Sequence, residues 1–502
     1  MTTTFGRRAR LLGTALGALT LLSACAVGPD YERPSAPVPP AYKEGGVTPV
    51  AFAPAIPRPA IPREDGWRPA APGQAASGPW WTVFRDPVLD GLMQRVEVDN
   101  QSLKAAEAAY RQAKALADQA RSAFFPSLSV SGGADRAGTV GSGNRSVSGI
   151  SGSRSGTPVT TYDVGLGASW APDLWGRIRR SVESNDANLQ ASAADLAAAR
   201  LSAQAQLATA YFQLRVADER KALLERAIAA YRQSLEIARN RHAVGTATLA
   251  DVFTAETQVR STESQLVALG VQRAQLEHAI AVLVGQTPAA FALAPAPLTA
   301  TVPDIPPGVP SALLERRPDI AAAERQMAQA NAQIGIAESA WYPDVLLTGS
   351  LSNSATILPK LLQAPTAIWA VGAQVAQTLF DGGTREAEVE LRRAVFDQSV
   401  AQYRQTVLTA FQEVEDQLAA QRILAQQAAV QDDAVRLARE AERLTLNQYR
   451  AGTLPYSSVL TSQTAALSDE ESALSVRQSR LLAAVSLLQA LGGAPGGNPP
   501  NF

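Results

Sequence analysis

Residues 162–176, YDVGLGASWAPDLWG, decide the fold because a short alternating strand passes here into a long helix. One face of the strand is apolar and the other is polar or small: Tyr162, Val164, Leu166, Ala168 and Trp170 against Asp163, Gly165, Gly167 and Ser169. Eight steps of ~3.3 Å span about 26 Å, with an aromatic residue at each end. This matches the ~25 Å apolar band and aromatic girdles of an outer-membrane barrel strand. The edge strand of a soluble sandwich shows the same alternation, so both interpretations stay open at this point.

A very long helix follows, from Gly176 to about Arg241. Its apolar residues recur in heptads, with Leu207, Leu214, Ile228 and Leu235 on one seam. Such a repeat predicts supercoiling against neighbouring helices, and the expected length is on the order of 100 Å. After a turn at Gly245, a second heptad helix returns to Gly285. The two helices are therefore predicted to form an antiparallel coiled-coil hairpin.

The same unit recurs in the second half of the chain. The turn glycines Gly245 and Gly452 are 207 residues apart, as are Gly285 and Gly492, and strand-like alternation recurs at residues 345–351 and 369–375. We therefore predict a tandem duplication that is mainly α, with four β-strands. The expected organisation is a signal peptide (1–24), a lipidated Pro-rich segment (25–85), a first repeat (86–287), a Pro-rich linker (288–317), a second repeat (318–492) and a flexible tail (493–502).

Four strands cannot close a barrel. An open sheet edge in lipid leaves backbone groups without hydrogen bonds, at a cost of several kcal/mol each. Three chains would supply about twelve strands, which lies within the known range for outer-membrane barrels. The sequence therefore predicts an oligomer in which the hairpins pack side by side into a ring.

The N-terminus has the form of an export signal. Arg7, Arg8 and Arg10 precede an apolar run from Leu11 to Leu22, which is too short to span a membrane. The run ends at Leu22-Ser23-Ala24-Cys25, which resembles the lipobox of bacterial lipoproteins. Cys25 is the predicted site of lipid attachment, and Ala26 after it implies delivery to the outer membrane. Several acyl chains would make a firm anchor.

Composition excludes several other functions. Lys and Arg number 45 against 46 Asp and Glu, so no basic field for nucleic acid is present. One cysteine and two histidines cannot supply a disulfide framework or a multi-ligand Cys/His metal site. No cofactor besides the covalent lipid is expected, and the sequence indicates no catalytic constellation. The acidic group Glu413, Glu415 and Asp416 is interpreted as a solvated or lumen-facing charge cluster on a helix, and not as an acid/base pair.

A set of motifs resembles the TolC-type outer-membrane efflux factors, and most closely their lipoprotein branch, which includes OprM and NodT. The motifs are Leu314-Glu315-Arg316-Arg317-Pro318-Asp319-Ile320, Ala340-Trp341-Tyr342-Pro343, Leu379-Phe380-Asp381-Gly382-Gly383 and Phe411-Gln412-Glu413-Val414-Glu415-Asp416. Gly28-Pro29-Asp30-Tyr31 and Trp80-Trp81 extend the resemblance over nearly all of the chain after Cys25.

The resemblance implies a trimeric tube, with a β-barrel in the outer membrane of a Gram-negative bacterium and an α-helical barrel in the periplasm. It also implies docking on a periplasmic adaptor (membrane-fusion) protein and an inner-membrane pump, commonly proton-driven and of the RND type. The chain would then be a passive exit duct for small molecules such as drugs, without enzymatic activity. A periplasmic coiled-coil scaffold lipoprotein without a pore is the alternative, but it does not explain the four membrane-suited strands.

The same resemblance assigns roles to the two helix turns. Arg241, Gly245, Thr246, Gly452 and Thr453 match the tips that meet the adaptor, although turn formation alone explains the glycines equally well. Asp251 and Tyr449 match a pair that hydrogen-bonds between coiled coils in the closed state of some members. Two aspartates that narrow the pore in some relatives correspond to Ser458 and Thr461. Gate closure is therefore expected to rest on neutral hydrogen bonds, packing or other residues.

Overall fold

The computed structural model describes residues 26–36, 38–40, 42–44, 79–138, 158–303, 305, 316–363 and 367–493. The chain divides into two compact units. The described parts of 1–33, 112–189 and 325–400 form one unit, and those of 34–111, 190–324 and 401–502 form the other. Three predicted features, the signal peptide, Cys25 and the tail beyond residue 493, lie outside the described residues.

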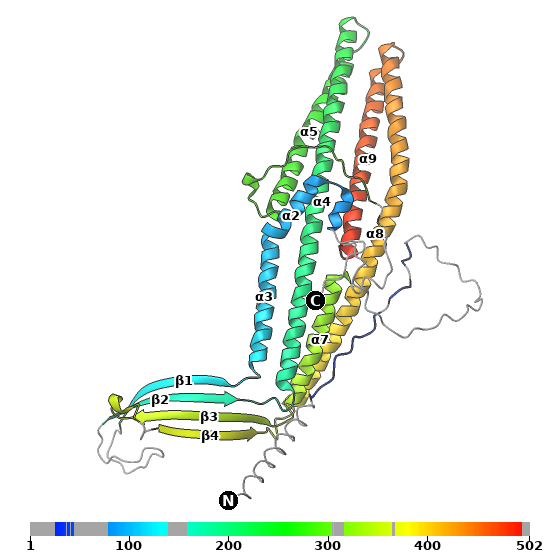
Figure 1. Ribbon diagram of the computed structural model, residues 1–502. Helices are drawn as coiled ribbons and strands as arrows, with labels where there is room; N and C mark the ends of the chain where they lie inside the picture. The colour runs from blue at the N-terminus through cyan, green and yellow to red at the C-terminus, as the bar shows by residue number, and fades with distance from the viewer. Residues whose placement is uncertain are drawn as a thin grey trace, which may run out of the picture. The chain divides into compact units, whose positions relative to one another are not determined.

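The first unit contains one antiparallel sheet of four strands in the order β1-β2-β3-β4 (Figure 1). The strands are β1 (Ser127–Ala137), β2 (Val159–Trp170), β3 (Asp344–Ala355) and β4 (Ala367–Ala376). The prediction of four strands is confirmed, and β2 begins three residues earlier than the predicted start at Tyr162. In the described chain, β1 and β4 each have one edge without a partner strand.

The register of the sheet separates an apolar face from a polar face. Leu166 on β2 lies opposite Val130 on β1 and Leu351 on β3, and Leu351 lies opposite Trp369 on β4. The residues between them are small or polar, such as Gly165 opposite Ser131 and Ser352. Directly opposed residues project from the same face of an antiparallel pair, so the apolar face continues across the middle of all four strands.

Four long helices form two hairpins. Helices α4 (Arg177–Ala243) and α8 (Thr384–Arg450) have 67 residues each, and α5 (Leu249–Leu283) and α9 (Tyr456–Ala490) have 35 each. Every helix of the second hairpin begins and ends 207 residues after its counterpart in the first. The predicted duplication of the hairpins is confirmed to the residue.

The turn glycines have the backbone conformation that the duplication requires. Gly245 and Gly452 have φ of +78° and +81°, in the left-handed region where a Cβ atom is costly. Gly285, with φ of +70°, also lies against another segment, because an added Cβ atom would come within 2.3 Å of the Asp99 carbonyl oxygen. These glycines therefore set both the chain reversals and one close approach of the backbone.

Shorter helices complete the units: α2 (Pro87–Asp99), α3 (Gln101–Ser122), α7 (Pro318–Ser339) and the 3₁₀ helices η1 (Trp80–Phe84), η2 (Pro288–Ala290) and η4 (Leu358–Lys360). The Asp86 carboxylate caps α2 by accepting hydrogen bonds from the backbone N–H groups of Val88 and Leu89. Trp80 and Trp81 are buried, as expected for packing residues. None of the described helices is both long enough and apolar enough to span a membrane.

Candidate functional site

The apolar face of the sheet continues into a group of aromatic residues at one end. β1 and β3 begin at this end, and β2 and β4 finish there. The Trp170 indole donates to the Phe124 carbonyl at 3.0 Å, and the Trp175 indole donates to the Pro343 carbonyl at 2.8 Å. The Trp175 ring stacks on Tyr342 with 5.0 Å between centroids. Amphipathic rings of this kind occupy the interface between lipid and water in membrane proteins.

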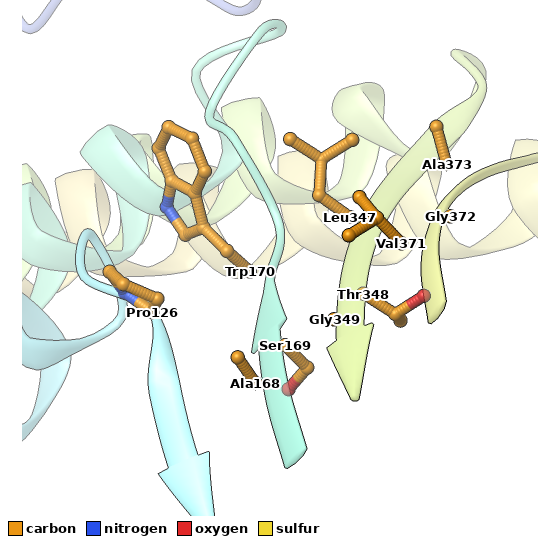
Figure 2. Close-up of a pocket in the computed structure, with 10 residues that line it drawn as sticks. All are labelled: Pro126, Ala168, Ser169, Trp170, Leu347, Thr348, Gly349, Val371, Gly372 and Ala373. Atoms are coloured by element: carbon orange, nitrogen blue, oxygen red, sulfur yellow. The ribbon is translucent and has the colours of Figure 1, made fainter. Parts of the chain in front are cut away.

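A shallow cavity of about 360 Å³ lies on the sheet near these rings. Figure 2 shows the Trp170 and Leu347 side chains standing on the same side of the sheet, as their direct pairing requires. Gly349, Gly372 and Ala373 leave the depression because their side chains are absent or small. None of the described residues that line this cavity carries a charge. The cavity is therefore a shallow depression in the apolar face of the sheet. Its lining lacks a group of polar residues that would bind a ligand.

The hairpin turns have the same hydrogen bonds at equivalent positions. Thr246 donates its backbone N–H and its hydroxyl to the Arg241 carbonyl, at 2.8 and 3.0 Å. Thr453 does the same to the Gln448 carbonyl, at 3.0 and 2.9 Å. These contacts satisfy the last helix carbonyls. Both threonines thus have a turn-forming role, and their predicted contact with an adaptor stays a prediction.

Arg241 joins the first tip to the second. Its guanidinium lies 4.7 Å from the centroid of the Tyr449 ring, and it also donates a hydrogen bond to the Tyr449 carbonyl. Tyr449 is only 2% exposed and packs edge-on against Tyr456. Burial raises the pKa of both phenols, and that of Tyr456 reaches about 12. The neutral phenols therefore belong to an apolar cluster shared by the two hairpins.

Asp251 and Tyr449 lie in the same tip region, but they form no hydrogen bond within the described chain. The Asp251 carboxylate accepts from the Thr248 backbone N–H at 3.0 Å and from the Thr248 hydroxyl at 2.9 Å. In return, the Asp251 N–H donates to the Thr248 hydroxyl, which completes a capping box at the start of α5. The Tyr449 hydroxyl has no partner among the described residues. The cap uses only the Oδ2 atom of Asp251, and the expected bond between coiled coils stays a prediction.

Ser458 and Thr461 lie in the first turn and a half of α9. The Thr461 hydroxyl donates to the Ser457 carbonyl at 3.0 Å, one helical turn back, and the Ser458 N–H donates to the Pro455 carbonyl at 3.2 Å. These hydrogen bonds are local to the helix start. The predicted role of the two side chains at the gate stays a prediction.

Sequence reasoning missed a buried polar link between the hairpins. The Gln463 amide on α9 donates to the Ser234 hydroxyl on α4 at 3.0 Å, and the Tyr231 hydroxyl donates to the Gln463 carbonyl at 3.2 Å. Gln463 falls between Val459 and Ala466 on an otherwise apolar seam. A polar residue at such a position often specifies register in a coiled coil, and this signal is present in the sequence.

The acidic group on α8 is solvated as predicted, with Glu413 and Asp416 exposed, and it also makes contacts that the sequence did not predict. Glu413 binds Arg317 at 2.6 Å, and the Glu415 carboxylate accepts from the backbone N–H groups of Lys43 and Glu44 at 2.6 and 3.0 Å. Two of the three acids therefore attach other segments of the same unit to α8, because cationic and N–H donors from those segments lie within hydrogen-bond distance.

Comparison with known proteins decides the family. The family model described as "Outer membrane efflux protein" matches residues 92–286 and 309–493. The chain belongs to the outer membrane efflux protein family. Membership is consistent with the apolar sheet face, the aromatic residues at its end and the duplicated hairpins. The function predicted from the sequence, an outer-membrane channel component of an efflux system, is confirmed, and the scaffold without a pore is not supported.

Similar members of the family support the same assignment. The chain is 31% identical to the pyoverdine export outer membrane protein OpmQ of Pseudomonas aeruginosa, over 85% of this chain and 90% of that protein. It is 30% identical to the probable efflux pump outer membrane protein TtgC of Pseudomonas putida, over 96% and 95%. The solved outer-membrane channel OprN is 28% identical with a TM-score of 0.81, covering 94% of this chain and all of that one.

Proposed function

We propose that this outer membrane efflux protein is a passive exit duct that catalyses no reaction and receives small molecules from a pump in the inner membrane through a periplasmic adaptor. The observation that carries the proposal is the sheet, whose apolar face suits lipid and whose Ser- and Gly-rich face suits a water-filled lumen. Relatives are named for pyoverdine export and for toluene efflux, which are chemically unlike. Such variety fits a duct whose substrates are selected by the pump. The pump is expected to be of the proton-driven RND type.

The direct test is electrical. Purified protein reconstituted in planar bilayers is expected to give discrete conductance steps once its periplasmic end is opened by mutation. Insertion of the same protein without any conductance, in every variant that opens the tip, would contradict the duct and favour a scaffold without a pore.

We further propose that three copies form the duct. β1 and β4 each have an open edge, and a barrel in lipid requires both to be paired. The helices show the same need. Ile423, Val430, Leu437 and Leu444 recur every seven residues along α8 and are exposed in the single chain, Val430 by 72%. On α5, Phe253, Val267 and Val271 are also exposed.

The contacts between the two hairpins of one chain indicate which helices would meet between copies. α4 contacts α9 through Tyr231 and Gln463, and through the ion pair of Arg220 with Glu471 at 2.9 Å. The exposed seams of α5 and α8 therefore remain for neighbouring copies, and α8 of one chain would pack against α5 of the next.

Cysteine cross-linking tests this arrangement. A variant with both Val267→Cys and Val430→Cys, which lie equally far from their turn glycines, is expected to yield covalent trimers under oxidation, and each single variant is expected to stay uncrosslinked. Cross-links in the single variants, or none in the double variant, would contradict the α8-to-α5 contact.

We also propose that Cys25 carries the lipid anchor. The described residues after it are held firmly: the Val27 N–H donates to the Trp175 carbonyl at 3.1 Å. The Arg180 guanidinium donates to the Val27 and Gly28 carbonyls at 3.1 and 2.9 Å and binds Asp30 at 2.9 Å. Residue 26 therefore lies beside Trp175 in the aromatic group, at the level where an acyl chain would enter lipid.

Mass spectrometry of the mature N-terminus tests the anchor. We expect a triacylated Cys25 in outer-membrane material, and we expect Cys25→Ser to be released or mis-sorted while its helices still fold. An unmodified Cys25 in correctly sorted protein would contradict the proposal.

A further inference from the structure

A cavity of about 490 Å³ lies in the second unit, away from the hairpin tips. Its walls come from α4, α8, α9 and residues 300–302 of the segment that joins the two repeats. One part of the lining is apolar, with Leu223 on α4, Val435 on α8 and Leu474 on α9. A cavity of this size and mixed lining is large enough for a small organic molecule.

The charged residues of the lining are four arginines, Arg226, Arg439, Arg477 and Arg480, and three acids, Glu219, Asp432 and Glu470. Several are already engaged within the chain. Arg439 forms an ion pair with Glu470. Arg477 donates to the Leu298 and Ala300 carbonyls at 3.0 and 3.3 Å, and Glu219 accepts from the Leu298 N–H at 3.4 Å. These contacts attach the joining segment to α9 and α4.

Two arginines of the lining remain without an anionic partner among the described residues. Neither Arg226 nor Arg480 makes an ion pair there. The Nε atom of Arg480 is closed to solvent, so a ligand in the cavity can reach this residue only at its terminal guanidinium nitrogens. A guanidinium presents a planar set of donors that matches a carboxylate. The cavity therefore offers a binding position for an anion.

We propose that this cavity binds a singly charged organic carboxylate with a compact apolar body. The carboxylate would bind Arg480 and Arg226, and the apolar body would contact Leu223, Val435 and Leu474. Asp432 lies in the same lining without an ion-pair partner among the described residues, so a second negative charge on the ligand is disfavoured. This argues against inorganic phosphate and for a monocarboxylate.

The proposed site has a role separate from transport through the duct, because its ligand would contact both repeats. α4 belongs to the first hairpin, α8 and α9 belong to the second, and residues 300–302 connect them. A ligand that binds α4, α8 and α9 together stabilises their arrangement by mass action. The carboxylate thus acts as a stabiliser of the periplasmic hairpins, independent of what passes through the duct.

Titration calorimetry on the full-length protein in detergent tests the site, with 4-phenylbutyrate as the probe and its neutral amide as the matched ligand control. We expect saturable binding of the acid and none of the amide. Arg480→Gln and Arg226→Gln should each weaken binding by roughly tenfold or more, as expected when a charged hydrogen bond is lost. Asp432→Asn should tighten binding because it removes a repulsive charge.

Arg436→Gln is the matched control, since Arg436 lies on α8, pairs with Asp433 and does not line the cavity. It should bind the acid like the parent. Arg226 is exposed, so its variant remains informative even if Arg480→Gln fails to fold. No saturable binding by the parent, or unchanged affinity in both arginine variants, would overturn the proposal.

Discussion

The two hairpin tips share a backbone, yet equivalent positions carry His242 in the first and Tyr449 in the second. His242 is exposed, and its Nδ1 lies 3.1 Å from the Ala247 carbonyl oxygen of its own turn. Tyr449 is buried in the cluster between the hairpins, beneath the guanidinium of Arg241. At this position the first tip exposes its side chain, whereas the second buries a ring against residues of the first.

The helix starts differ in the same sense. α5 begins with the Thr248–Asp251 capping box, which satisfies two backbone donors locally. At the equivalent positions α9 has Pro455 and Ser458, and its N-cap makes no side-chain hydrogen bond. The start of α5 thus has a local cap that the start of α9 lacks. We therefore expect the second tip to open more readily than the first.

The largest expected effect comes from removing the buried ring. Tyr449→Ala should destabilise the tip cluster by ~3–5 kcal/mol, as for other large aromatic truncations in cores. His242→Ala, at the equivalent exposed position, should stay within about 0.5 kcal/mol of the parent. Hydrogen exchange of α8 and α9 near the turn measures both. Equal protection of the α8 and α9 amides from exchange in the two variants would contradict the proposed difference between the tips.

Tyr449→Phe separates packing from hydrogen bonding. Because the hydroxyl has no partner in the described chain, its removal should leave tip protection unchanged or slightly raised. A loss comparable with that of Tyr449→Ala would instead support the expected bond to Asp251, formed between copies.

The next effect concerns the contact between the tips. Arg241→Ala removes a cation–π contact and a charged hydrogen bond, and it should cost the second tip about 2–3 kcal/mol. The equivalent Gln448→Ala should cost much less, since its carbonyl, not its side chain, holds Thr453. Exchange rates at Ala451 and Gly452 would report the difference, and similar rates in both variants would contradict the role of Arg241.

A smaller effect is expected from copying the first cap into the second. Pro455→Thr combined with Ser458→Asp should create a capping box at the start of α9 and stabilise it by roughly 1 kcal/mol. Thermal unfolding and tip exchange measure the gain. The single Ser458→Asp variant is the control, because without the threonine the box cannot form. No gain in stability in the double variant would mean that the missing cap does not weaken the start of α9.

The smallest expected effect is a pH dependence at Glu442. This residue on α8 has Gln463 and Glu470 of α9 and Arg439 nearby, and its charge reaches Tyr231 of α4. Burial raises its pKa above the ordinary value of 4.5; the Gln463 hydrogen bond and Arg439 oppose this, and Glu470 adds to it. Between pH 4.5 and the raised value, the folded tip holds more protons than the unfolded chain. Tip stability should therefore fall as pH rises through this window.

Glu442→Gln should flatten that dependence in unfolding experiments at several pH values. Glu440→Gln is the control of opposite sign, because the Arg443 guanidinium lowers the pKa of that exposed carboxyl. An unchanged slope in Glu442→Gln would place the titrating group elsewhere.

Much of the fold could be predicted because its signals are local or periodic. Heptads define the long helices, glycines at a constant offset define the turns, and alternation defines the strands. The link from Gln463 to Ser234 joins residues 229 positions apart, and only the packing of two helices reveals it. The Asp251 cap is readable in the sequence, since Thr248 and Asp251 have capping-box spacing. The resemblance instead assigns Asp251 a distant partner, whereas the contacts that form within the chain are those of the local cap.

Single-channel recording in planar bilayers tests most directly whether the second tip closes the duct. The parent and His242→Ala should be closed or weakly conducting, and Tyr449→Ala should show a much larger conductance. If His242→Ala opens the channel while Tyr449→Ala stays closed, the first tip is the gate, and closure by the second tip is contradicted.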